Sequence, residues 1–237
     1  MKNLSIVIPV FNEAASLKEL LCRTTAACEP YSPYEIICVD DGSWDGSFEL
    51  LLELKKNYEH LVIVRLQKNS GQSAALTAGF KTAHGSIIVM MDADLQNPPE
   101  AIPTLLENMD GFDAVIGWRK DRKDSFLKRA GSRIGNSLRR MILRDPFHDN
   151  ACSLKAFKSA VAADLVKFNH MIFFLPDLIE IAGYRIKEVP VPHEHRKHGR
   201  SKYRTFSLSG ISSFWDTLFV KALKKRKLTY TVERIIA

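Results

Sequence analysis

Two carboxylates spaced two residues apart directly follow a run of apolar residues in this sequence. The run Ser86–Met91 leads into Asp92, Ala93 and Asp94, and Gln96 follows two residues later. An apolar run of this length between turn-forming residues is typical of a strand buried on both faces. Two carboxylates and an amide at the end of such a strand suit a divalent cation, Mg²⁺ or Mn²⁺, that holds a phosphate. An acidic turn that caps the next helix is the other interpretation, and the motif alone does not exclude it.

The elements that must position these carboxylates alternate between strand-like and helix-like segments. Apolar strand-like runs separated by segments of helical periodicity predict βαβ units, and therefore an α/β fold with a mostly parallel, right-handed central sheet flanked by helices. The strands are expected at residues 4–9, 35–39, 61–66, 86–91 and 114–117.

Polar residues follow every one of these strands. Since the carboxyl ends of parallel strands meet at one edge of a sheet, five polar loops are expected on one rim, where open α/β sheets bind their ligands. This arrangement favours a binding site over a simple helix cap. The loops are Phe11-Asn12-Glu13, Asp40-Asp41-Gly42-Ser43, Lys68-Asn69, Asp92-Ala93-Asp94 and Trp118-Arg119.

The pattern changes after Arg119. A strongly basic helix is expected over Ser125–Leu143, a second helix over Lys155–Phe168, an exposed apolar run over Met171–Leu175 and a short β segment over Tyr184–Val191. No internal repeat or low-complexity linker divides the chain. We therefore expect one catalytic domain over residues 1–205 and a separate segment over residues 206–237.

The charge of the chain favours anionic partners. The 237 residues carry a formal net charge of +7 and are 46% hydrophobic, enough for one sizeable domain. No recognisable nucleic-acid-binding motif accompanies the basic excess, so a nucleic-acid partner is not expected. The four cysteines lack metal-ligand spacing and are expected to be reduced thiols of a cytosolic protein. No cleavable signal and no run approaching the ~20 apolar residues of a spanning helix is present, so any membrane contact is expected to be peripheral.

The segment 206–237 contains an amphipathic helix with a basic end. Its apolar residues recur every three or four positions and run into Lys224-Lys225-Arg226-Lys227. Such a helix suits the interface of an anionic membrane. Packing on the domain, or on a second subunit of a homo-oligomer, is the alternative. The apolar positions are Leu208, Ile211, Phe214, Trp215, Leu218, Phe219 and Ala222.

The motifs, taken together and in this order, resemble those of family 2 glycosyltransferases, which have the A-type fold of nucleotide-diphospho-sugar transferases. The similarity is greatest to the branch that glycosylates polyprenyl phosphates, such as dolichyl-phosphate mannose synthase and its bacterial relatives. It rests on Ile8-Pro-Val-Phe-Asn-Glu13, Val39-Asp-Asp-Gly-Ser43, Asn69-Ser-Gly-Gln72, Asp92-Ala-Asp-Leu-Gln96, Arg119, Asp149-Asn-Ala-Cys-Ser-Leu-Lys155 and Arg196-x-x-Gly199-x-Ser201-Lys202-Tyr203.

The resemblance implies roles for matching residues. The base and ribose of a GDP- or UDP-sugar would be held by Pro9, Phe11, Glu13, Val39, Asp40 and Asp41. The divalent cation would lie among Asp92, Asp94 and Gln96, with Ala93 beside the donor. The acceptor phosphate would be held by Arg119, Arg133 and Ser137, and a mobile loop with Arg196, Arg200, Ser201 and Lys202 would close over the donor phosphates.

The implied activity is metal-dependent, inverting transfer of a sugar to a polyprenyl phosphate at the cytoplasmic face of a membrane. A phosphate acceptor is already ionised near neutral pH, so positioning and charge stabilisation matter more than a general base. The alternative is transfer to a hydroxyl of a glycan or another non-lipid acceptor. That reaction would need a catalytic carboxylate, for which Asp149 is the candidate.

Overall fold

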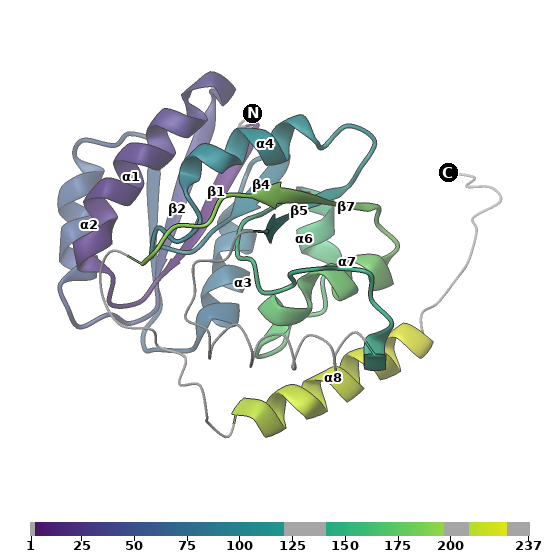
Figure 1. Ribbon diagram of the computed structural model, residues 1–237. Coiled ribbons are helices and arrows are strands. Elements are labelled where there is room, and N and C mark those ends of the chain that lie inside the picture. The colour runs from purple at the N-terminus through teal and green to yellow at the C-terminus, as the bar shows by residue number, and fades with distance from the viewer. Residues whose placement is uncertain (1–2, 121–140, 197–208, 227–237) are drawn as a thin grey trace, which may run out of the picture.

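A seven-stranded sheet forms the centre of the molecule (Figure 1). The computed structural model describes residues 3–120, 141–196 and 209–226, and within them the strand order is β3-β2-β1-β4-β6-β5-β7. β6 runs antiparallel to β4 and β5, and the other described pairings are parallel, which confirms the mostly parallel sheet. The strands are β1 (Leu4–Val10), β2 (Tyr34–Asp40), β3 (Leu61–Arg65), β4 (Ile87–Met90), β5 (Ala114–Arg119), β6 (Lys155–Lys158) and β7 (Ile186–Val191).

Helices cover both faces of the sheet, which explains the continuous apolar runs of the central strands. One face packs against α1 (Ala14–Cys28), α2 (Ser47–Lys55) and α4 (Ile102–Glu107). The other packs against α3 (Gln72–Thr82), α6 (Ser159–Asp164) and α7 (Leu175–Ala182). Short 3₁₀ turns are η1 (Glu29–Tyr31), η2 (Pro99–Ala101) and η3 (Met171–Phe174).

Gly79 sets how closely α3 approaches the sheet. A Cβ atom at this position would lie 2.3 Å from Cγ1 of Val7 and 3.2 Å from Cγ2 of Val39. The alanine-rich helix therefore packs at a separation that larger side chains would prevent.

Two sequence expectations in the second half are wrong. Lys155–Lys158 forms β6 rather than the start of a helix, because Ala156 and Phe157 are fully buried in the sheet between β4 and β5 and this pairing overrides local helical periodicity. The apolar run at Met171 is buried rather than exposed, with Met171 at 0% and Phe174 at 1% exposure. Both segments complete the core on the α3 side of the sheet.

The reversed direction of β6 decides where the chain segment before it lies. Lys155, the first residue of β6, pairs with Met90, the last residue of β4. In an antiparallel pair, the residues that lead into one strand lie beside the residues that leave the other. The loop Asp145–Leu154 therefore enters the sheet at the same edge where Asp92 and Asp94 emerge.

The last described helix, α8 (Ser209–Lys225), packs against α7 and lies along the lower side of the molecule in Figure 1. Val220 is fully buried, Lys224 Nζ lies 2.6 Å from Glu180 Oε2, and Asp216 Oδ2 lies 3.0 Å from His170 Nδ1. The expected amphipathic helix is therefore present, and one of its sides is attached to the domain.

The opposite side of α8 is apolar and faces solvent. Phe214 is 45%, Trp215 65% and Phe219 44% exposed. Among the described residues, no helix combines the length and the hydropathy that crossing a membrane requires.

Candidate active site

A pocket of about 240 Å³ lies where β1, β2 and β4 end, at the carboxyl edge of the sheet. It contains eight of the residues to which the resemblance assigned donor or metal contacts. Residues up to 187 positions apart in the sequence therefore meet in one cavity, as the convergence of strand-end loops predicted. The lining residues are Pro9, Val10, Phe11, Glu13, Asp41, Asn69, Gly71, Gln72, Ala75, Asp92, Ala93, Asp94 and Arg196.

Asp92 and Asp94 place two carboxylates close together in this pocket. Oδ1 of Asp92 accepts a hydrogen bond from Nε2 of Gln72 at 2.6 Å, and Oδ1 of Asp94 accepts one from the Gln96 N–H at 3.0 Å. Leu95, which directly follows Asp94, has a positive φ of 61°, so the chain turns sharply here. Burial, followed by the negative charge of Asp94, raises the pKa of Asp92 to about 6.

This pair of like charges fits a divalent cation, because a cation would relieve both the burial and the repulsion of the carboxylates. No group of three His, Cys, Asp or Glu side chains among the described residues could hold a metal. The carboxylates of Asp92 and Asp94 would therefore share a cation with oxygen ligands of other kinds, such as donor phosphates. The side chain of Gln96 does not line the pocket.

Arg196 reaches the pocket from the segment that follows β7. Its Nη2 donates a hydrogen bond to Oδ2 of Asp94, and its Nη1 lies 3.5 Å from Oε1 of Glu13. The guanidinium thus lies between carboxylates from the β1 and β4 loops. The other residues expected in the closing loop, Arg200, Ser201 and Lys202, lie outside the described residues, as do Arg133 and Ser137.

The three candidates at the end of β2 lie in different environments. Asp41 lines the pocket, and its carboxylate accepts hydrogen bonds from the N–H groups of Ser70 at 2.7 Å and Gly71 at 2.9 Å. This pairing holds the β3–α3 loop against the pocket. Val39 and Asp40 are fully buried beneath the pocket and do not line it.

A feature not expected from the sequence is Trp44, which packs against the pocket residue Phe11. Its ring is 76% exposed and meets Phe11 edge to face, with 4.9 Å between centroids. Two hydrogen bonds of 2.9 Å, from the Asn12 N–H to Ser43 Oγ and from the Trp44 N–H to Asn12 Oδ1, join the two loops. The signal in the sequence was one large aromatic residue within an otherwise polar strand-end loop.

Arg119 and Asp149 form a bidentate pair at the end of β5. Nε of Arg119 donates to Oδ2 of Asp149 at 2.7 Å, and Nη2 donates to Oδ1 at 2.9 Å. Only 11% and 4% of the two side chains are exposed. Because both carboxylate oxygens accept from Arg119, Asp149 is better suited to orient the guanidinium than to take a proton from an acceptor hydroxyl.

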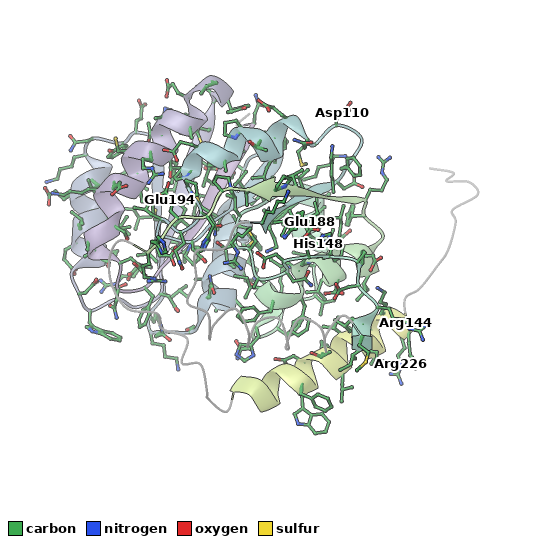
Figure 2. All side chains as sticks on the ribbon, viewed as in Figure 1. Asp110, Arg144, His148, Glu188, Glu194 and Arg226 are labelled. Carbon is green, nitrogen blue, oxygen red and sulfur yellow. The ribbon has the colours of Figure 1, made fainter. Side chains whose placement is uncertain are left out.

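The loop that carries Asp149 is fixed on both sides. Figure 2 labels His148 and Glu188, whose Nδ1 and Oε2 atoms lie 2.6 Å apart, and the His148 ring stacks on Trp118 with 4.4 Å between centroids. Nζ of the fully buried Lys155 donates to the carbonyl oxygen of Asn150 at 3.1 Å. Burial lowers the pKa of this lysine. These contacts keep the Arg119–Asp149 pair close to the edge where the acidic loop lies.

Comparison with known proteins agrees with this fold. Residues 5–166 match the family described as Glycosyl transferase family 2. The chain therefore belongs to this family of sugar-transferring enzymes. It is 43% identical over 210 residues to undecaprenyl-phosphate 4-deoxy-4-formamido-L-arabinose transferase from Edwardsiella ictaluri, covering 87% of this chain and 65% of that protein. The chain thus spans about two thirds of the length of this curated relative.

Two solved structures share the fold at low sequence identity. A mannosyltransferase from Pyrobaculum calidifontis in complex with GDP-Man and Mn²⁺ matches with a TM-score of 0.67 and 19% identity over 97% of this chain and 66% of that chain. Glucosyl-3-phosphoglycerate synthase from Mycobacterium tuberculosis in complex with UDP matches with a TM-score of 0.64 and 16% identity, covering 96% and 82%. Both confirm the expected A-type architecture.

Proposed function

We propose that this chain is the catalytic part of an enzyme that transfers a sugar from a nucleoside-diphosphate sugar to a polyprenyl phosphate. The observation that carries the proposal is the juxtaposition of two sets of charged groups at one edge of the sheet. The acidic pair Asp92 and Asp94 suits a metal-held diphosphate, and Arg119 suits an anionic acceptor. The name of the Edwardsiella relative, an undecaprenyl-phosphate transferase, supports this acceptor class.

Asp92 and Asp94 would hold Mg²⁺ or Mn²⁺, with Gln96 as a further candidate on the same loop. When bound, the cation supplies Lewis-acid stabilisation to the departing nucleoside diphosphate. Phe11, Glu13 and Asp41 line the part of the pocket where the base and ribose would bind. Arg196 would add positive charge to the diphosphate from the opposite wall.

Arg119 would orient the acceptor phosphate for in-line attack on the anomeric carbon, which inverts its configuration. The bidentate bond to Asp149 fixes the plane of the guanidinium, and a guanidinium held in a fixed plane matches the geometry of phosphate oxygens. An ionised phosphate needs no base, so this chemistry depends on positioning two anions against each other. Arg133 and Ser137 are proposed to complete the acceptor site.

A panel of nucleotide sugars tests the function. Purified protein with Mn²⁺ is incubated with radiolabelled GDP- and UDP-sugars and either extracted polyprenyl phosphate or soluble oligosaccharides. We expect label to enter the lipid fraction. Transfer to oligosaccharide alone would instead support the alternative of a hydroxyl acceptor, for which Asp149 would have to leave Arg119 in order to act as a base.

The raised pKa of Asp92 predicts that metal affinity depends on pH. Its pKa of about 6 lies above that of an unfolded aspartate, so the metal-free protein loses stability as pH rises between about 4 and 6. A cation binds the deprotonated carboxylate. The apparent affinity of the protein for the cation should therefore fall about tenfold for each pH unit below about 6.

Thermal unfolding with and without Mn²⁺ from about pH 5 to 7.5 measures this pH dependence of the metal affinity. A Mn²⁺-induced rise in melting temperature that is the same across this range would contradict it, and Asp92→Asn serves as the insensitive control.

Trp44 is expected to contribute to binding of the donor base. Base–aromatic stacking is worth about 1–3 kcal/mol, so Trp44→Ala should weaken nucleoside-diphosphate affinity about tenfold. Bound nucleotide should also quench tryptophan fluorescence in the wild type and in Trp215→Phe, but far less in Trp44→Phe. Trp215 is a matched control because it is 65% exposed on α8, outside the pocket. Equal quenching in both variants would exclude Trp44 from the base site.

We also propose that the exposed side of α8 binds an anionic membrane peripherally, at the cytoplasmic face where the lipid acceptor would be reached. Phe214→Ser/Trp215→Ser should reduce co-flotation with anionic liposomes, because both rings face solvent. Removing the whole helix would also expose α7, so the point variants are the cleaner test. Leu52→Ser, at a 49% exposed leucine on α2, is the control. Flotation that stays at the wild-type level in the double variant would show that α8 is not the anchor.

A further inference from the structure

Arg23, on α1, contacts three different parts of the chain. Its Nε and Nη2 donate to the two carboxylate oxygens of Glu100 at 2.8 Å each. Nη2 also donates to Oε1 of Glu194 at 3.1 Å, and Nη1 donates to Oε1 of Glu19 at 3.0 Å. The Arg23 side chain is 20% exposed, so these ion pairs are partly shielded from water. None of these four residues lines the donor pocket.

Glu194 connects this cluster to the metal-binding loop. It lies on the segment that leaves β7 and crosses toward α1, as Figures 1 and 2 show. Its side chain pairs with Arg23, while its backbone N–H donates to the carbonyl oxygen of Gln96 at 2.8 Å. One residue therefore ties the segment to helix α1 on one side and to the Asp92–Gln96 loop on the other.

Arg196 follows Glu194 by two residues. A fully extended chain spans at most about 3.6 Å per residue, so fixing Glu194 confines the Arg196 backbone to within about 7 Å of it. Residues 192–196 belong to no helix or strand, so side-chain and backbone contacts such as these determine their path. Where Glu194 is held, the Arg196 guanidinium reaches Asp94 and Glu13 in the donor pocket.

We propose that Arg23 is a positioning residue that, through Glu194, holds Arg196 at the diphosphate end of the donor pocket. The inference rests on the proposed function for the identity of the ligand. Arg23 itself would contact neither donor nor acceptor. Its role is to reduce the conformational freedom of the segment before Arg196 binds phosphate, and so to lower the entropic cost of donor binding.

Glu19 offers a matched control on the same guanidinium. It pairs with Arg23 at 3.0 Å, as Glu194 does at 3.1 Å, but it lies one turn away on the same helix as Arg23, whereas Glu194 lies on the segment that follows β7. Glu19→Ala and Glu194→Ala each remove one carboxylate from Arg23. A merely structural role for the cluster predicts similar effects, whereas a positioning role predicts an effect of Glu194→Ala alone.

The experiment is calorimetric titration with UDP and with GDP, each in the presence of Mn²⁺, using whichever binds the wild type more tightly. We expect Glu194→Ala to weaken binding about tenfold and Glu19→Ala less than about twofold. Arg23→Lys, which cannot form the bidentate pair with Glu100 and reach Glu194 together, should resemble Glu194→Ala. Adding Glu194→Ala to Arg196→Ala should change affinity less than about twofold, because the two act through one contact.

Three results would overturn the positioning role: equal losses in the Glu19 and Glu194 variants, additive losses in the Arg196→Ala background, or unchanged affinity in Arg196→Ala. Melting temperatures recorded for each variant separate a loss of folded protein from a loss of affinity. A wild-type protein that binds neither nucleoside diphosphate would overturn the proposed function and this inference with it. A wild type that binds normally while the variants fail the pattern overturns the inference alone.

Discussion

Asp94→Ala is expected to abolish sugar transfer, lowering kcat/KM by at least about 10³-fold. Asp94 is 8% exposed, lines the donor pocket, and contacts both Arg196 and the Gln96 N–H. Removing its carboxylate deletes a proposed cation ligand and leaves Arg196 with only Glu13 of its two carboxylate partners in the pocket. Both changes weaken stabilisation of the departing diphosphate, so the defect should include the chemical step as well as donor affinity.

The control for this variant is Asp110→Ala, because Asp110 is an exposed aspartate at the turn after α4, labelled in Figure 2. Both proteins should unfold at temperatures close to that of the wild type. Transfer assays with saturating Mn²⁺ measure the rate of sugar transfer. Thermal unfolding followed by circular dichroism measures the unfolding temperature. Transfer by Asp94→Ala at near wild-type rate, with metal present, would remove the metal-site hypothesis.

Arg119→Ala should lower transfer to polyprenyl phosphate by about 100-fold or more while leaving nucleoside-diphosphate affinity within a few-fold. The same change leaves the nearly buried carboxylate of Asp149 without its bidentate partner, so it should also cost about 3–5 kcal/mol of stability. The expected phenotype therefore combines a loss of acceptor use with a lower melting temperature.

The double variant Arg119→Ala/Asp149→Ala separates these two effects. Removing both charges avoids the uncompensated carboxylate, so much of the lost stability should return. Transfer should not return, because the proposed acceptor contact is still missing. Recovery of transfer together with stability would show that Arg119 serves only the fold. A matching loss of donor affinity in the single variant would place Arg119 at the donor instead.

The sequence predicted that the strand-end loops converge on one pocket because the relevant signals are local. Apolar strands buried on both faces and the polar residues that end them can be read within about ten residues. The direction of parallel strands then brings those ends to one edge without further information. Phe11, Asp41 and Asp94 meet in one pocket for this reason.

The proposed acceptor side depends on contacts that local patterns do not encode. β6 is only four residues long, and its neighbours in the sheet, not its own periodicity, make it a strand. The Arg119–Asp149 pair joins residues 30 positions apart, and the Arg23–Glu194 pair joins residues 171 positions apart. Such pairs follow from strand register and loop paths, which a single sequence does not reveal.

The reversed β6 strand also has a consequence for how enzymes of this architecture can diversify. The four-residue ladder between β4 and β6 fixes the start of the acidic loop relative to Lys155, the first residue of β6. The loop ahead of Lys155 is joined to β5 through Arg119 and to β7 through Glu188, so we expect changes in its exposed part to affect that side of the sheet first. If the proposed function holds, we expect selection for a new acceptor to act on this loop and the end of β5 before it changes the half of the sheet proposed to bind the nucleotide.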